Sequence, residues 1–303
     1  MLDILFLGTG ASIPSRDRGM PAVAVRCGTE TVLFDCGEGT QRQMMVSPFS
    51  FMKIKGIFIT HMHGDHFLGL PGLIQTMGLS GRKEKLFVCG PEGLSDAVNT
   101  FLSICEGEIG YDLETIDMVS GDRLAFGGFS VTAFRTEHTV PSLGYKFTEN
   151  ESRGRFDRKK AAALGIRPGP DFSRLHSGEP IGDVTPDMVI GPPRSGCSVV
   201  YSGDTVPCRE LSSAAMGADV LIHESTFSGK ESELAETHRH STAVQAAETA
   251  RDCGCRVLFM VHTSNRYDIK DTLAEEAERI FADSLIPDDM TLYRVSKEDI
   301  RSV

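Results

Sequence analysis

The stretch Thr60–Gly72, "THMHGDHFLGLPG", dominates the interpretation of this sequence, because it places His61, His63, Asp65 and His66 within six residues. Imidazole and carboxylate donors without a thiolate suit zinc, and also manganese or iron. A lone histidine in a turn is usually a hydrogen-bonded structural residue. Four donors at this density, directly after an apolar run, instead predict a metal site.

Three further candidate ligands end other apolar runs of the chain. His138, Asp204 and His262 each follow a stretch with the composition of a strand, as His61 does. Loops at the carboxyl ends of strands converge in open α/β sheets, so these residues can meet the first four. Position alone leaves each of the three open between a ligand and a structural residue. Seven donors are too many for one tetrahedral ion and suit two ions sharing a bridging carboxylate, with positions left for water.

Short apolar runs punctuated by Gly, Pro and Asp predict a chain with more strands than helices. We expect strands at 2–8, 21–27, 31–37, 56–61, 85–90, 129–138, 143–149, 198–204, 219–225 and 256–262. Helical spacing predicts helices at 94–105, 241–254 and 268–284. Thr242 and Gln245 form a capping-box pattern for the second helix, and Gly254 marks its end. Interleaved strands and helices predict a layered α/β domain.

The 303 residues allow one large or two ordinary domains, with 40% hydrophobic and 24% charged residues as in globular proteins. No apolar run approaches a membrane span and the N-terminus lacks a signal-peptide pattern, so we expect no membrane partner. The net charge of −11 argues against a surface coated for general nucleic-acid binding. The eight cysteines include no C-x-x-C pair, which predicts reduced thiols and a cytoplasmic protein.

The segment 150–195 differs from the rest, because it is rich in Gly and Pro and short of strand signals. Residues 151–174 hold seven basic side chains against three acidic ones, a local reversal of the overall charge. We therefore predict a flexible excursion inserted into the core. Composition leaves it open between a solvated surface loop and an arm that grips phosphates. The basic side chains are those of Arg153, Arg155, Arg158, Lys159, Lys160, Arg167 and Arg174.

The H-x-H-x-D-H pattern after a strand resembles that of the metallo-β-lactamase superfamily. Over nearly its whole length, the chain more closely resembles the short-form ribonuclease Z family, endonucleases that trim the 3′ trailer of precursor tRNA. The motifs that carry this resemblance are "FLGTGASIPSRDRG" (6–19), "LFDCGEGTQRQM" (33–44), "ITHMHGDHFLGLPGL" (59–73), "TEHTVPSLGYKF" (136–147), "YSGDT" (201–205), "HESTF" (223–227), "HRHSTAVQAAETA" (238–250) and "VHTSNRY" (261–267).

The resemblance implies an α/β fold, the four-layer αββα metallo-β-lactamase sandwich, as one domain over 1–303 that assembles as a homodimer. It implies two Zn²⁺ per subunit, with Mn²⁺ as an alternative. His61, His63 and His138 would hold one ion. Asp65, His66 and His262 would hold the other, and Asp204 would bridge the two.

The resemblance also implies the catalytic roles. Asp65 would accept the proton of the attacking water. His240, held by Glu224, would donate a proton to the leaving 5′-oxygen, since a neighbouring carboxylate favours the protonated imidazole. The products would be a 3′-hydroxyl on the tRNA and a 5′-phosphate on the trailer. His223 receives no role.

Two segments are implied to bind the precursor tRNA. The basic excursion resembles the protruding substrate arm of the family, and its seven basic residues would contact phosphates. The loop "PSRDRG" (14–19) matches the family's P-x-K-x-R-N pattern at Arg18, but has Arg16 in place of Lys and Gly19 in place of Asn. The alternatives are another hydrolase on the same scaffold and a non-catalytic metal-bound scaffold, although the latter typically loses ligands.

Overall fold

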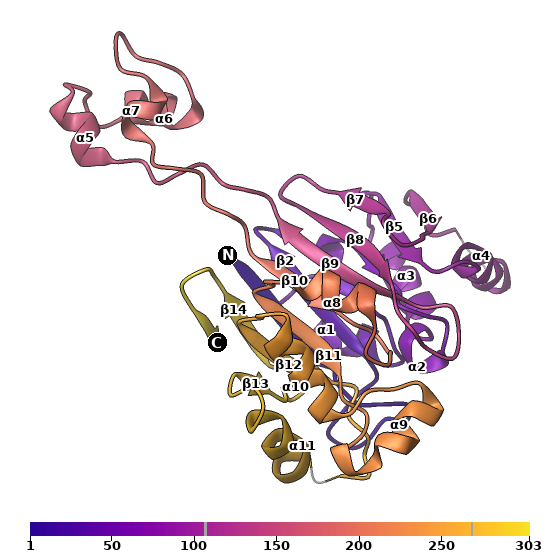
Figure 1. Ribbon diagram of the computed structural model, residues 1–303. Helices are drawn as coiled ribbons and strands as arrows, with labels where there is room; N and C mark the ends of the chain where they lie inside the picture. Colours follow the sequence, from indigo (N-terminus) through magenta and orange to yellow (C-terminus); the bar gives the residue numbers. More distant parts are fainter. Residues whose placement is uncertain (106–107, 268) are drawn as a thin grey trace. The chain divides into compact units, whose positions relative to one another are not determined.

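The computed structural model describes residues 1–105, 108–267 and 269–303 (Figure 1). It divides into two compact units. The first comprises Met1–Thr148 and Cys197–Val303, and the second, Glu149–Gly196, interrupts it. The second unit begins and ends within one residue of the basic segment 150–195, which differs from the rest of the sequence in composition.

The described residues of the first unit form two sheets. In spatial order, one sheet consists of β15 (Ile300–Ser302), β14 (Leu292–Val295), β1 (Leu2–Gly8), β2 (Ala22–Cys27), β3 (Glu30–Phe34), β4 (Ile54–Phe58), β5 (Leu86–Gly90) and β6 (Leu113–Asp117). The other, also in spatial order, consists of β13 (Ser284–Leu285), β12 (Val257–Val261), β11 (Val220–Glu224), β10 (Ser198–Tyr201), β9 (Leu143–Glu149), β8 (Phe129–Arg135) and β7 (Arg123–Ala125).

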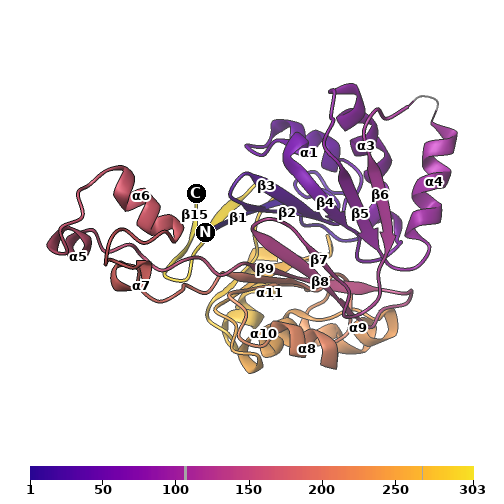
Figure 2. The same ribbon diagram turned by 90° about the horizontal axis from the view of Figure 1, so that it is seen from above.

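The helices of this unit lie on the outer faces of the two sheets (Figure 2). Beside the first sheet or its loops are α1 (Thr40–Val46), α2 (Gly64–Phe67), α3 (Leu70–Leu79) and α4 (Leu94–Ile104), with the 3₁₀ turn η1 (Phe51–Lys53). Beside the second are α8 (Arg209–Ala215), α9 (Ser232–His238), α10 (Ala243–Asp252) and α11 (Ile269–Glu278), with the 3₁₀ turn η2 (Gly229–Glu231). The expected four-layer αββα sandwich is thereby confirmed.

Strand β1 shows why the sequence forms layers. Leu2, Ile4 and Phe6 point into the core between the sheets, whereas Leu5 and Leu7 pack under α1, α3 and α4. Side chains alternate across a strand, so a strand that is apolar at every position is buried on both faces. A third apolar cluster joins the second sheet to α8, α10 and α11.

The helix α10 confirms the prediction made from its capping pattern. The Thr242 hydroxyl accepts a hydrogen bond from the backbone N–H of Gln245, and the Gln245 side chain accepts one from the backbone of Thr242. Gly254, just past the helix, adopts φ +64°, which glycine tolerates at no steric cost. The predicted helix 268–284 is observed as the shorter α11, which ends at Glu278, and Ser284 belongs to β13 instead. Its first expected residue, Asp268, lies outside the described residues.

The predicted strands that lead to His61, His138 and Asp204 end earlier than their composition indicates. β4 ends at Phe58, β8 at Arg135 and β10 at Tyr201, in each case three residues before a candidate ligand. These candidate ligands therefore lie in the loops after the strands. Within a strand, alternate side chains point to opposite faces, whereas a loop can turn several donors toward one centre.

The second unit contains its own secondary structure, α5 (Arg158–Ala163), α6 (Pro170–Ser177) and α7 (Pro186–Val189). Asp157 caps α5 by accepting a hydrogen bond from the backbone N–H of Lys160. Ala161, Leu175 and Val189 form a small buried apolar cluster with their neighbours. The segment is thus folded locally, although its sequence shows few strand signals.

Among the helices of the described residues, we find none with the length and apolar character needed to cross a bilayer.

Candidate functional site

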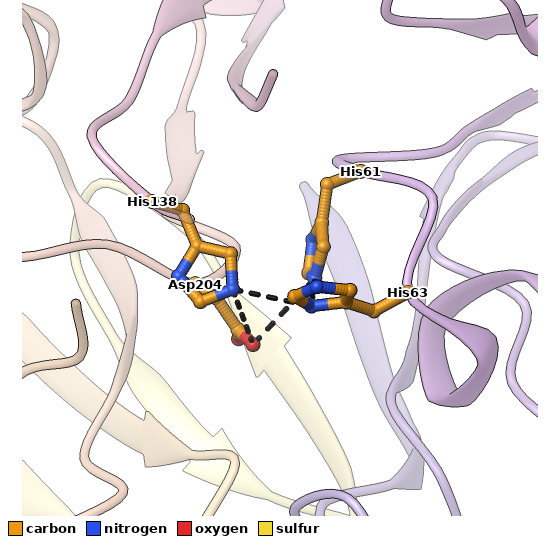
Figure 3. Close-up of side chains that lie close together, drawn as sticks. All are labelled: His61, His63, His138 and Asp204. Atoms are coloured by element: carbon orange, nitrogen blue, oxygen red, sulfur yellow. Dashed lines mark hydrogen bonds and ion pairs between the residues drawn. The ribbon is translucent and has the colours of Figure 1, made fainter. Parts of the chain in front are cut away.

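Loops from both sheets bring His61, His63, His138 and Asp204 together (Figure 3). The Nε2 atom of His61 lies 3.0 Å from Nδ1 of His63, which lies 3.2 Å from Nε2 of His138. One carboxylate oxygen of Asp204 lies 3.7 Å from His61 Nε2 and 4.0 Å from His138 Nε2. One donor atom from each residue fits within 4.8 Å of the others, the compactness that a single ion requires.

A second cluster adjoins the first through Asp204. It contains Asp65, His66 and His262, whose donor atoms also lie within 4.8 Å of one another. The Nε2 atoms of His66 and His262 are each 3.3 Å from the same Asp204 oxygen. They lie 3.7 and 3.4 Å from Oδ2 of Asp65. All seven donors singled out from the sequence therefore converge, with the Asp204 carboxylate between the two groups.

Two buried donor atoms in this cluster are available to bind metal ions. Within the described part of the chain, neither Nε2 of His66 nor Oδ1 of Asp204 has a hydrogen-bond partner. An unsatisfied buried polar atom costs about 1–3 kcal/mol, so such atoms are rare unless a ligand pairs with them. The surrounding donors are imidazole nitrogens and carboxylate oxygens, which bind zinc or manganese. The residues present therefore fit a pair of divalent ions.

The electrostatics favour the metal-binding form at His61 and at Asp204, whereas at His66 burial opposes protonation but the Asp204 and Asp35 carboxylates outweigh it and raise the pKa well above its ordinary value. Burial lowers the pKa of His61 well below its ordinary value, and nearby imidazoles add to the effect, so its ring is neutral. Burial opposes ionisation of Asp204, but the charges of His262 and His66 hold the pKa of this carboxyl well below its ordinary value. Neutral imidazole and ionised carboxylate are the ligand forms.

Asp35 supports the cluster from behind, and reasoning from the sequence gave it no role. Its buried carboxylate accepts hydrogen bonds from the Thr60 backbone N–H at 2.8 Å, the Thr60 hydroxyl at 2.9 Å and the Tyr201 hydroxyl at 2.8 Å. It also lies 2.8 Å from Nδ1 of His66. Its φ is +57°, a strained value for a residue with a side chain. The signal in the sequence is an aspartate directly after the apolar run "VLF".

His240 and Glu224 form the predicted pair at the edge of the cluster. Nδ1 of His240 lies 2.8 Å from Oε1 of Glu224, which is 1% exposed. Burial opposes protonation of His240, but the charge and hydrogen bond of Glu224 outweigh it and raise the pKa of His240 to about 9. Glu224 is itself held by the backbone N–H of Thr205 and the hydroxyl of Thr226. An imidazole that stays protonated at neutral pH can donate a proton.

His223, next to Glu224, is not among the described residues whose donor atoms form the metal-binding groups. It is fully buried, and its Nδ1 lies 2.7 Å from the backbone carbonyl of Glu224.

A cavity of about 420 Å³, which we call the metal cavity, opens beside these residues. Its lining includes metal-cluster residues and His240, together with residues that the sequence did not single out. The added residues include Ser12, Ile13, Phe227, Asn265 and Arg266. The backbone N–H of Ser12 donates to Oδ2 of Asp65 at 3.0 Å, and the Asn265 side chain donates to the carbonyl of Ile13 at 2.8 Å.

The two arginines predicted to bind substrate near the N-terminus have different environments. Arg16 is exposed and lines a separate cavity of about 340 Å³. Arg18 is only 7% exposed. Its guanidinium donates to the Thr9 hydroxyl, to the carbonyl of Pro287 at 3.0 Å and to Asp288 at 3.3 Å. The charge of Arg18 is therefore engaged inside the protein, which leaves Arg16 as the exposed cation of this loop.

The basic residues of the second unit are all exposed. Four of them line a cavity of about 890 Å³ within that unit, namely Arg155, Arg158, Lys159 and Lys160. Arg174 pairs with Glu179 at 3.0 Å, and Arg153 donates to the carbonyl of His176 at 2.7 Å. Arg167 is exposed as well. The unit therefore presents one cluster of exposed cations, on α5 and on the residues just before it.

Comparisons with known proteins agree with this geometry. The family model described as a beta-lactamase superfamily domain matches residues 30–263. A ribonuclease Z of Methanosarcina acetivorans is 43% identical over 295 residues, which cover 96% of this chain and 97% of the relative. A ribonuclease Z of Archaeoglobus fulgidus is 42% identical over 307 residues and 99% of each chain.

A solved structure resembles the present one over nearly its whole length. The short form of human tRNase Z superposes with a TM-score of 0.72 at 28% identity, covering 97% of this chain and 99% of that one. One conclusion follows from the matching family model, the extent of identity to the two relatives and the shared fold. This chain belongs to the ribonuclease Z family of the metallo-β-lactamase superfamily.

Proposed function

We propose that this protein is a metal-dependent endoribonuclease that removes the 3′ trailer from precursor tRNA. The observation that carries the proposal is the juxtaposition of seven metal donors with the Glu224–His240 pair at one cavity. A scaffold protein has no need of a buried carboxylate that keeps an imidazole protonated. The names of the relatives, ribonuclease Z and tRNase Z, support the choice of substrate.

We propose two Zn²⁺ per subunit, with manganese as the alternative ion. His61, His63 and His138 would hold the first, and Asp65, His66 and His262 the second. The Asp204 carboxylate, which contacts both groups, would bridge them. When bound, such a pair of ions lowers the pKa of water toward roughly 7 and neutralises charge on phosphoryl oxygens.

The chain's own residues would handle the protons. Asp65 would accept the proton of the attacking water, and the N–H of Ser12 at 3.0 Å fixes the carboxylate oxygen involved. His240 would donate a proton to the leaving 5′-oxygen of the trailer, while Glu224 holds the opposite ring nitrogen. Since the nucleophile derives from water, the substrate's 2′-hydroxyl is not needed. The products are a 3′-hydroxyl on the tRNA and a 5′-phosphate on the trailer.

We propose that the inserted unit, 150–195, is the tRNA-binding arm of a homodimeric enzyme. Its exposed cations at Arg155, Arg158, Lys159 and Lys160 can contact the backbone of a folded RNA, which is recognised by shape and phosphates. Arg153, Arg167 and Arg174 extend the basic surface of the unit, and Arg16 adds a cation in the N-terminal loop. The cysteines are thiols, which suits the cytoplasm that we propose as its location.

The test is cleavage of an end-labelled precursor tRNA with a 3′ extension. We expect the wild type to make a single cut near the acceptor end, and both Asp65→Ala and a chelator to abolish it. Restoring zinc should restore the chelated enzyme but not the variant. If the metal-loaded protein leaves the RNA intact yet hydrolyses bis(p-nitrophenyl) phosphate, the tRNA assignment is wrong. Inactivity on both substrates would instead support the scaffold alternative.

A further inference from the structure

Arg266 stands out among the residues that line the metal cavity. Among those described lining residues it is the only arginine or lysine. Its side chain is 47% exposed, and it follows His262 by four residues, in a loop whose Ser264 and Asn265 also line the cavity. A fixed cation at the edge of a metal cavity is a natural contact for a further phosphate of a polyanionic substrate.

Three contacts hold the guanidinium in place. It lies over the ring of Phe227, with 5.2 Å between the guanidinium carbon and the ring centroid. Nη1 is 3.4 Å from Oε1 of Glu231, and Nε donates to the Ser264 hydroxyl at 3.2 Å. Most exposed arginines lose side-chain entropy when they bind an anion. In this protein a stacked ring and a carboxylate have already restricted the side chain, so less entropy remains to be lost on binding.

Phe227 also indicates which side of the scissile bond Arg266 serves. The buried Phe227 ring lies 6.0 Å from the ring of His240, between centroids. Phe227 therefore contacts both His240 and Arg266. On the proposed function, His240 protonates the 5′-oxygen of the trailer, so the trailer lies on the His240 side of the cleaved phosphate. Arg266 shares that side.

We propose that Arg266 binds the first internal phosphate of the trailer, the one that joins its first and second nucleotides. This inference rests on the proposed function, because it uses the role of His240 to orient the RNA. The Phe227 ring and the Glu231 carboxylate position the guanidinium, and Arg266 is a binding residue that touches the substrate. The site accepts any nucleotide sequence, since the contact is to the backbone.

The experiment replaces single phosphates of the precursor by uncharged methylphosphonates, each on a deoxynucleotide with a matched deoxy control. In the wild type, neutralising the first internal trailer phosphate should lower kcat/KM by about 10- to 100-fold, as expected for loss of a charge-assisted hydrogen bond. Arg266→Ala should show a similar loss on the unmodified precursor. With this variant, neutralising the same phosphate should cause no further loss, because the partner is already absent.

Two variants serve as controls for this coupling. Arg279→Ala removes an exposed arginine just past α11 that pairs with Glu275 and does not line the metal cavity. It should retain the wild-type rate and the wild-type sensitivity to the methylphosphonate. Arg266→Lys keeps the charge but not the planar guanidinium, and should recover part of the loss.

The inference is overturned if Arg266→Ala and the wild type show the same sensitivity at the first trailer phosphate. It is also overturned if the coupling appears only at a phosphate on the tRNA side of the cut. In both cases the wild type still cleaves the precursor, so the proposed function survives. A wild type that leaves the precursor intact refutes the proposed function, and this inference with it.

Discussion

Nδ1 of His66 lies 2.8 Å from Oδ2 of Asp35, so Nε2 of the same ring faces Asp204 and the other candidate ligands. A histidine that binds a metal through one nitrogen usually donates the N–H of the other to a carboxylate or carbonyl, which sets the tautomer. The same Asp35 carboxylate holds Thr60, the residue before His61. One buried carboxylate therefore supports candidate ligands of both groups.

Replacing Asp35 by Asn should weaken metal binding more than it disturbs the fold. The amide keeps the volume but cannot accept all four hydrogen bonds, so the orientation of His66 is lost. We expect metal affinity to fall by about 10- to 100-fold. The measurement is zinc content per subunit after dialysis against a metal buffer, with thermal unfolding as the check on folding. Thr31→Ser, at a buried position in β3 that does not contact the cluster, is the matched control. Wild-type zinc retention by Asp35→Asn would contradict the prediction.

Replacing His240 by Gln should reduce the chemical step while leaving the metals bound. Loss of a general acid typically costs about 10²- to 10⁴-fold in rate. The loss should be much smaller on bis(p-nitrophenyl) phosphate, because p-nitrophenolate leaves without protonation. Glu224→Gln should show the same pattern, and the double variant should be no worse than His240→Gln, since the two act as a unit. Single-turnover rates on both substrates measure this. Equal losses on the two substrates would mean that His240 has another role.

Replacing the inserted unit with a short turn should abolish cleavage of RNA but not the hydrolysis of a small phosphodiester. Strand β9 pairs antiparallel with β10, and Thr148 lies opposite Ser198, so the two strand ends are adjacent. An Asn-Gly turn in place of 150–196 suits such a hairpin. We expect no detectable cleavage of precursor tRNA, whereas hydrolysis of bis(p-nitrophenyl) phosphate continues. Retained cleavage of the RNA would show that the unit is a surface loop with no part in substrate binding.

The buried carboxylate of Asp219 should make stability depend on pH in the acid range. Burial opposes its ionisation, but hydrogen bonds from Lys297 at 2.7 Å, Ser198 at 2.8 Å and Arg256 at 3.0 Å lower its pKa below the ordinary value. Because the folded-state pKa is the lower one, the stabilisation is present above the ordinary pKa of about 3.9 and disappears as pH falls through the folded value.

Asp219→Asn should accordingly lower the free energy of unfolding by about 2 kcal/mol at pH 7, with a smaller difference from wild type below about pH 4. Urea unfolding of the two proteins at pH 7 and pH 3 gives both differences. Asp252→Asn changes a carboxylate that is exposed, and should have little effect at either pH. A difference that is the same at both pH values would show that the Asp219 charge contributes nothing.

The prediction of the strands succeeded where burial on both faces leaves an uninterrupted apolar run, as at 4–7 in β1 and throughout β12. It did not extend to the short strands β6, β7, β13, β14 and β15, in which most residues are half-buried or exposed and give no apolar run to detect. The helices α1, α3, α8 and α9 were not predicted either. Three of them, α1, α8 and α9, are seven residues long, too short for the spacing of apolar residues to distinguish a helix from a loop. The ten-residue α3 contains Pro71, Gly72 and Gly78, which are typical of loops.

Reasoning from residue types was less able to assign the supporting residues. Asp35 belongs to the motif at 33–44, but an aspartate after a strand is common and does not by itself indicate a supporting role. Its four hydrogen bonds join segments up to 166 residues apart in the chain. Arg18 was predicted to bind substrate because the loop 14–19 resembles the family's P-x-K-x-R-N pattern. Only the packed structure shows that this guanidinium bonds to residues near the C-terminus, including Pro287.

The sequence by itself determined the chemistry of this protein. The imidazole and carboxylate donors, the interleaved strands and the basic segment are properties of residue type and local spacing, which physical chemistry links directly to metal binding, burial and charge. Only the tertiary structure decided the distances among these donor atoms, the hydrogen bonds by which Asp35 supports them, and the place of Arg266 at the cavity beside Phe227. These relationships depend on how loops from separate strands meet, and no local pattern encodes a distance between residues far apart in the chain.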